Sequence, residues 1–115
     1  MAFLRAALRR DSSHFVEETS GAAAVSIVQN SIDNAEPFDV VVVDRKSSDI
    51  GGLETTQLLR KVGYGGPIVG TSWDLTASIE SEWADAGCTA VIEKPVDLGQ
   101  LIDTVAQLIL NANGQ

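Results

Sequence analysis

The sequence predicts an α/β domain with a mainly parallel sheet and helices against both of its faces. Segments with apolar residues at helical spacing alternate along the chain with short strand-like apolar runs, as in repeated βα units. Four consecutive valines, Val40–Val43, are too stiff at χ1 to favour a helix, and their unbroken apolar run indicates burial on both faces. With 115 residues, the chain has the size of one domain, and we expect residues 1–115 to form it.

The first part of the chain is expected to contain helix, strand and helix. In residues 2–10 the apolar side chains share one face and arginines lie opposite, which predicts an amphipathic helix. Residues 14–18 have the pattern of a short, half-buried strand. Ser20 can cap a second helix through its hydroxyl, and Glu36-Pro37 end that helix.

The rest of the chain is expected to alternate regularly. Asp74 is placed to cap the helix at 75–86, which Gly87 ends, and Asp97 with Gln100 resembles a capping box for the last helix. The apolar stripe of that helix consists of Leu98, Leu101, Ile102, Val105, Leu108 and Ile109. The expected elements are strands at 38–44, 67–71 and 89–92 and helices at about 53–62, 75–86 and from 98 onwards.

Composition excludes several classes of function. The net charge of −8, from 16 acidic and 8 basic residues, argues against nucleic-acid binding, which usually requires a basic face. No apolar run approaches the roughly 20 residues that span a bilayer, and the basic start lacks the features of a signal peptide. Cys88 has no second cysteine to pair with, which fits a reducing compartment. We therefore expect a soluble, cytoplasmic protein.

Three polar residues follow successive strands of the expected sheet. In open parallel sheets, ligands bind beyond the carboxyl ends of the strands, and Asp44, Ser72 and Lys94 stand there. Asp44 can act as a nucleophile towards a phosphoryl group or as a metal ligand. Ser72 can donate a hydrogen bond to a phosphoryl oxygen, with Thr71 as the alternative, and Lys94 can pair with the carboxylate or the phosphate. In the simpler interpretation, Asp44 caps a loop and Lys94 pairs with Glu93 at the surface.

The segments FDVVVVD, GGLE, GPIVGTS and EKPVD, in this order and spacing, resemble the receiver domain of two-component response regulators from about residue 3 to residue 110. The resemblance implies a flavodoxin-like, three-layer fold. It implies that Asp44 accepts phosphate from a histidine kinase or a histidine phosphotransfer protein, and that the chain is no enzyme beyond this self-catalysed step. It also implies Mg²⁺ held by Asp44 and the backbone carbonyl of Lys46. Gly52 occupies the family's glycine position, and Lys94-Pro95 is expected to be cis.

The chain also departs from the family pattern. Receivers begin with a central strand that ends in two acidic residues. A helix at 2–10 would leave this chain without that strand and without the acidic pair, so we expect weak or absent Mg²⁺ binding. The first strand is then missing, or supplied in trans, or replaced by rearrangement, and a homodimer formed by strand exchange is one outcome. The alternative makes residues 2–8 the strand and Asp11 the acid. Val91 and Ser48 replace the family's switch aromatic and proline.

Two functions from different classes follow. The first is a phosphorelay receiver that changes its protein contacts when Asp44 is phosphorylated. The second is a pseudo-receiver, a protein-interaction module that is not phosphorylated. A nucleotide-binding domain has little support, because Gly63–Gly66 precede a strand and open no helix.

Overall fold

Five strands form one sheet with the order β2-β1-β3-β4-β5 in the computed structural model, which describes residues 4–6, 16–18, 20–38, 40–46 and 49–112. The strands β3, β4 and β5 are parallel to one another, and β1 is antiparallel to both of its neighbours, so four of these five strands point the same way. The strands are β1 (Leu4–Ala6), β2 (Val16–Glu18), β3 (Val41–Asp44), β4 (Ile68–Ser72) and β5 (Ala90–Glu93).

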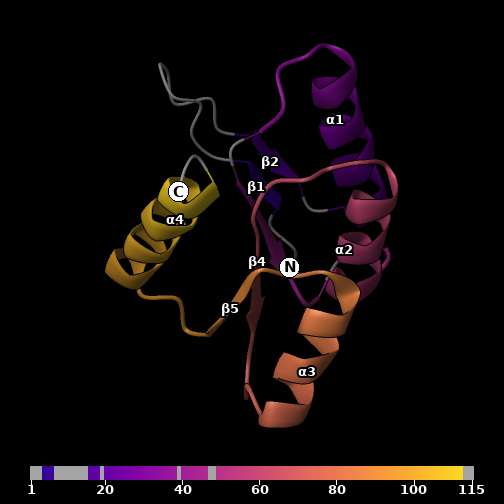
Figure 1. Cartoon of the computed structure of the whole chain (residues 1–115). Coiled ribbons are helices and arrows are strands. Elements are labelled where there is room, and N and C mark those ends of the chain that lie inside the picture. Colours follow the sequence, from indigo (N-terminus) through magenta and orange to yellow (C-terminus); the bar gives the residue numbers. More distant parts are fainter. Residues whose placement is uncertain (1–3, 7–15, 19, 39, 47–48, 113–115) are drawn as a thin grey trace.

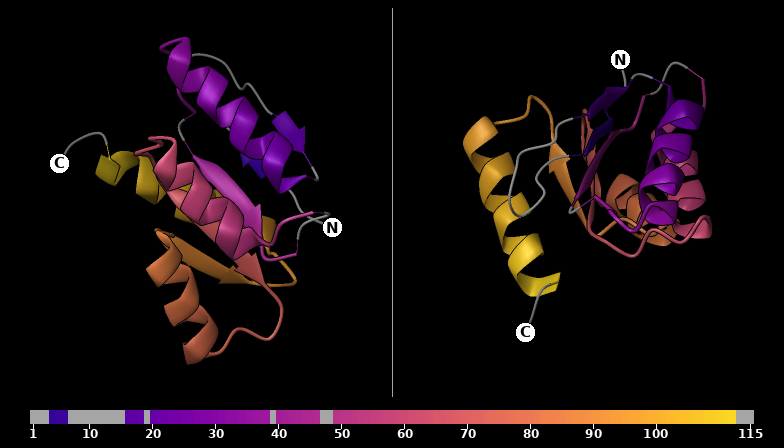
Figure 2. Two further views of the ribbon diagram at one scale, coloured as in Figure 1. Left: turned by 90° about the vertical axis from the view of Figure 1, so that its right-hand side faces the viewer. Right: turned by 90° about the horizontal axis from the view of Figure 1, so that it is seen from above.

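Helices cover both faces of the sheet, which gives three layers (Figure 1 and Figure 2). Three of the described helices lie on one face, and α4 lies on the other. The helices are α1 (Gly21–Asp33), α2 (Gly52–Lys61), α3 (Ala77–Ala86) and α4 (Leu98–Ala112). The predicted α/β three-layer fold is therefore confirmed.

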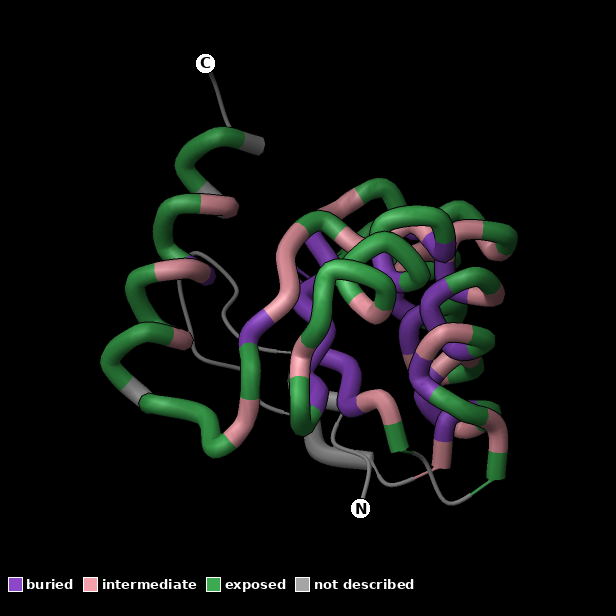
Figure 3. The backbone as a smooth tube through the Cα atoms, turned by 90° about the horizontal axis from the view of Figure 1, so that it is seen from below, coloured by how far each residue is buried: buried purple, intermediate pink, exposed green. Residues whose placement is uncertain are grey.

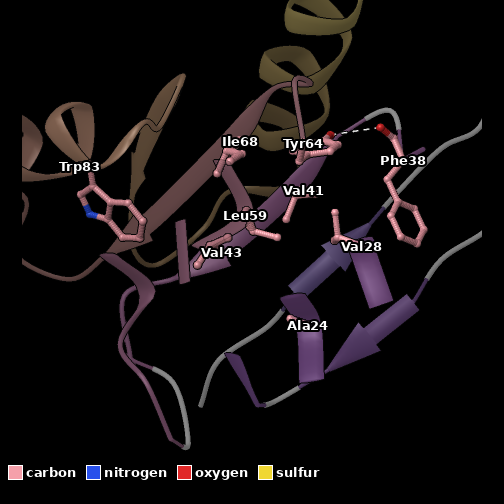
Figure 4. Close-up of a cluster of buried hydrophobic side chains, with 9 residues drawn as sticks. All are labelled: Ala24, Val28, Phe38, Val41, Val43, Leu59, Tyr64, Ile68 and Trp83. Atoms are coloured by element: carbon pink, nitrogen blue, oxygen red, sulfur yellow. Dashed lines mark hydrogen bonds between the residues drawn. The ribbon is translucent and has the colours of Figure 1, made fainter. Parts of the chain in front are cut away.

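The strand β3 is buried on both faces, as its valine run predicts. Val41 and Val43 belong to the cluster beneath α1, α2 and α3, which Figure 4 shows. Val40 and Val42 belong to the cluster beneath α4. Because side chains alternate along a strand, one short segment supplies both cores. Burial of each such side chain contributes about 1.5–3 kcal/mol relative to exposure.

The helix α4 is amphipathic, but its buried stripe is narrower than the sequence suggests. Val105 is buried, and Leu101 and Leu108 pack beside it. Ile102, which we assigned to the buried stripe, is 58% exposed, because it lies a step around the helix from Leu101. Figure 3 shows that much of this helix faces solvent.

The helix expected over residues 2–10 is wrong where the structure describes it, because Leu4–Ala6 form the strand β1. This strand fills the slot between β2 and β3, with Leu4 opposite Val43 and Ala6 opposite Val41. The physical reason is that β3 needs backbone partners on this side, and each orphaned buried amide costs about 1–3 kcal/mol. A short isolated helix offers little stability in return.

The first-strand position is thus filled by rearrangement, and association is not needed to complete the sheet. The alternative strand at 2–8 is confirmed over Leu4–Ala6. The strand β1, however, runs antiparallel to β3, which puts Ala6 beside the start of β3, at the edge away from Asp44. Asp11 lies outside the described residues.

Local signals predicted one helix start correctly and missed another. The Ser20 hydroxyl caps α1 by accepting from the Ala23 N–H at 3.2 Å. The helix α3 begins at Ala77 with Thr76 as its cap, so Asp74, whose φ is 49°, is not the cap. The Lys94-Pro95 bond is cis, as expected. No helix within the described ranges is both long and apolar enough to span a bilayer.

Candidate functional site

The carboxyl edge of the parallel strands brings the three sequence-predicted residues to one end of the sheet. Asp44 is the last residue of β3, Ser72 is the last residue of β4, and Lys94 follows β5 directly. The register aligns these ends, since Asp44 pairs with Thr71 and Ser72 pairs with Glu93.

Asp44 is a buried carboxylate with a cationic partner. It is 2% exposed, and the Lys94 ammonium donates to its Oδ2. The Lys46 backbone N–H donates to its Oδ1 at 3.1 Å. A buried charge is tolerated when it is paired and hydrogen-bonded, and both conditions are met here. Glu93, the alternative partner of Lys94, accepts instead from the Leu75 backbone N–H at 2.9 Å.

The hydroxyl of Ser72 is directed elsewhere. Its Oγ accepts from the indole Nε1–H of Trp83 on α3 at 2.8 Å, and Ser72 is 1% exposed. Side chains separated by an even number of residues point to the same face of a strand, which we call the same parity. Ile68 lies in the cluster beneath the three helices, and Ser72, four residues later on β4, points to the same face. Asp44 has the parity of Val42, which faces α4. Ser72 and Asp44 therefore leave the sheet on opposite faces.

Thr71, the alternative hydroxyl, has the parity of Asp44. It is the register partner of Asp44, and its Oγ1 donates to the Val43 carbonyl at 3.5 Å. Both hydroxyls thus lie on the strand that neighbours Asp44, and each is already engaged in a hydrogen bond.

Gly52 is required by the close approach of α2 to the end of β3. A Cβ at this position would lie 2.3 Å from the Asp44 carbonyl oxygen and 2.7 Å from Cα of Arg45. The Gly52 N–H donates to the Arg45 carbonyl at 2.8 Å. The glycine eight positions after Asp44 therefore allows the segment after β3 to fold back against it.

Asp49 connects this segment to the start of α1, a contact that no sequence pattern predicts. Its carboxylate accepts from the Ser20 hydroxyl at 2.8 Å and from the backbone N–H groups of Gly21 at 2.7 Å and Ala22 at 3.2 Å. The Ser20 hydrogen bond, with backbone N–H bonds, lowers the pKa of Asp49 well below its ordinary value. A negative charge at a helix N-terminus is favourable, but no local pattern links residues so far apart in the chain.

Trp73 places an exposed aromatic ring beside the site. The side chain is 56% exposed, and its ring centroid lies 5.7 Å from the Lys94 ammonium. This distance is within the range of a cation–π interaction. Lys94 is therefore held between a carboxylate and an indole ring.

Comparisons with known proteins identify the family. The profile of the response regulator receiver domain matches residues 1–106. The chain belongs to this family. It is 29% identical over 98 residues to Histidine kinase 1 of Arabidopsis thaliana, and the aligned region covers 82% of this chain and 8% of that protein. It is 32% identical over 80 residues to the sensory/regulatory protein RpfC of Xanthomonas campestris, and the aligned region covers 66% of this chain and 11% of that protein.

The receiver domain therefore spans about a tenth of the length of these relatives. Among solved structures, it is similar to the receiver domain of the Francisella response regulator 1452. The TM-score is 0.69 at 22% identity, with 82% of this chain and 74% of that chain covered. This likeness shows the fold.

Receiver domains generally bind Mg²⁺ at an acidic pocket, and the donor groups in the part of the chain that the structure describes do not fit such a pocket. Mg²⁺ prefers octahedral oxygen ligation with carboxylate charge. In the described part of the chain, no group of three or more His, Cys, Asp or Glu residues could hold a metal ion. Asp44 supplies a carboxylate, and both of its oxygens already accept from Lys94 and Lys46. The Lys46 carbonyl remains a predicted ligand that no contact tests.

Proposed function

We propose that this receiver domain accepts a phosphoryl group on Asp44 from a phosphohistidine donor in the cytoplasm and then changes its protein contacts. The observation that carries the proposal is the buried Asp44 carboxylate paired with Lys94 at the carboxyl edge of the sheet. A carboxylate at this position can attack phosphorus, and the adjacent ammonium can balance the charge of the product.

The chemical step is a substitution at phosphorus. An oxygen of Asp44 forms a bond to the phosphorus atom while the bond from phosphorus to the histidine nitrogen breaks. The electron pair of that bond stays on the imidazole, which takes up a proton. The product is an acyl phosphate, whose added charge Lys94 stabilises. Ser72 is the hydroxyl that we propose donates to a phosphoryl oxygen.

The relatives support the class of donor. Histidine kinase 1 and RpfC, by their names, are a histidine kinase and a sensory/regulatory protein, and both contain a segment similar to this chain. We infer that the donor is a histidine kinase or a histidine phosphotransfer protein.

The proposal is tested by incubation of the protein with acetyl phosphate and Mg²⁺, followed by intact mass and Phos-tag electrophoresis. We expect one acid-labile phosphoryl group that is absent from the Asp44→Asn variant. Asp103→Asn is the matched control, because Asp103 is an exposed carboxylate on α4, and this variant should be modified like the wild type. A phosphoryl group that persists on folded Asp44→Asn would assign the chemistry to another residue.

The second candidate is a pseudo-receiver that keeps the fold and interacts without phosphorylation. The poor fit between the described donor groups and Mg²⁺ favours it. Titration of the Trp83→Phe variant with Mg²⁺, followed by the fluorescence of Trp73 beside Lys94, separates the two functions. A saturable millimolar response supports the phosphoacceptor, and the absence of a response up to high concentration supports the pseudo-receiver.

A further inference from the structure

Trp83 is the buried partner of the Ser72 hydroxyl. The residue is 0% exposed, and Figure 4 shows its ring between α3 and the sheet. Gly70 on β4 makes room for the ring, because a Cβ there would lie 2.6–2.8 Å from three of its atoms. The ring is therefore seated in one place, and its Nε1–H meets Ser72 Oγ at 2.8 Å.

This hydrogen bond determines what Ser72 must give up in order to contact a phosphoryl group. The indole N–H is a donor only, so Ser72 acts as its acceptor in the buried layer. Asp44 leaves the sheet on the opposite face. To reach a phosphoryl oxygen on Asp44, the Ser72 side chain must turn about χ1 away from α3, and the Trp83 N–H then loses its acceptor. A buried donor without a partner opposes that turn.

We propose that Trp83 is a positioning residue that holds Ser72 in the rotamer directed towards α3, so that phosphoryl binding at Asp44 is coupled to α3 through this hydrogen bond. The inference rests on the proposed function of Asp44. Ile79, one turn before Trp83 on α3, packs against the same cluster, so a change at the indole ring reaches the helix through existing contacts.

The first test observes the bond by NMR of the two indole N–H groups, assigned with Trp73→Phe and Trp83→Phe. Ser72→Ala should shift the Trp83 signal and speed its hydrogen exchange in the free protein. Beryllofluoride with Mg²⁺, the probe that mimics a phosphoryl group on a carboxylate, should shift the same signal in wild type but not in Asp44→Asn. A Trp83 signal that Ser72→Ala or saturating beryllofluoride leaves unchanged would overturn the proposal.

The second test measures how strongly the hydrogen bond from Trp83 opposes phosphoryl binding. Trp83→Phe keeps a ring in the core but removes the N–H, so beryllofluoride should bind about fivefold more tightly, which corresponds to about 1 kcal/mol for one hydrogen bond. Val28→Ala is the matched control, because Val28 lies on α1 in the same buried cluster and its side chain has no donor or acceptor for Ser72. It should lower stability without tightening binding.

The outcomes separate the two proposals. If the wild-type protein binds beryllofluoride and Trp83→Phe binds it equally or less tightly, only the proposed role of Trp83 is overturned. If the folded wild-type protein neither binds beryllofluoride nor forms a phosphoryl adduct, the proposed function of Asp44 is overturned, and the proposed role of Trp83 with it.

Discussion

Replacement of Lys94 by methionine should destabilise the protein strongly. The variant keeps an unbranched side chain but removes the ammonium that pairs with Asp44, which is 2% exposed. Loss of one partner of a buried ion pair costs about 3–5 kcal/mol because a buried charge is left uncompensated. The Lys94 side chain is 18% exposed and the Lys46 N–H remains a donor, so we expect about 2–4 kcal/mol.

Asp44→Asn should cost much less. It leaves the Lys94 ammonium partly exposed and above the Trp73 ring, so the loss should be about 1 kcal/mol or less. The double variant removes both charges and should lie within about 1 kcal/mol of wild type. The two single effects are therefore expected to be strongly non-additive.

Urea unfolding followed by circular dichroism measures the four free energies of unfolding. Lys61→Met on α2 is the control, because Lys61 is exposed and its loss should cost less than about 1 kcal/mol. If Lys94→Met unfolded at the same urea concentration as Lys61→Met, or if the single effects simply added, the buried pair would not have the role assigned to it.

Three further perturbations test the fold around the site. Gly70→Ala should cost about 1–3 kcal/mol in urea unfolding because its Cβ meets the Trp83 ring, whereas Gly65→Ala, where a Cβ meets nothing within 4 Å, should be nearly neutral. Val41→Asp places a charge at a 0% exposed position and should give insoluble or unfolded protein; a soluble variant with wild-type circular dichroism would contradict the central place of β3. Asp49→Ala should lower stability near neutral pH. Because the folded-state pKa of Asp49 is lowered, the difference from wild type should shrink as the pH falls below about 4, and a difference independent of pH would refute this.

The sequence predicted the parts of the fold whose signals are local and periodic. The valine run indicated β3, and the spacing of Leu101, Val105 and Leu108 indicated α4. The strand β1 was missed because the helical spacing of residues 2–10 is also local, while the need for a partner beside β3 is a property of the whole sheet. Tertiary pairing decided the conformation of Leu4–Ala6 against the local pattern.

The candidate site was predictable to a similar extent. Parallel strands bring Asp44 and Lys94 to one edge, because the carboxyl ends of strands that run in the same direction lie together. The engagement of Ser72 by Trp83 was not predicted, because it depends on side-chain direction across two elements. A partial signal did exist: a glycine within a strand, such as Gly70, is one mark of a close approach, and Trp83 lies on the apolar side of the following helix.

The most direct test of the central claim is the chemical identity of the modified residue after incubation with a phosphorylated histidine phosphotransfer protein. Borohydride reduces an aspartyl phosphate to homoserine, and peptide mass spectrometry then locates the conversion. We predict homoserine at position 44 in the wild-type protein and none anywhere in Asp44→Asn. Folded wild-type protein in which Asp44 remains unconverted, while a known receiver in the same reaction is converted, would contradict the assignment of Asp44 as the phosphoacceptor.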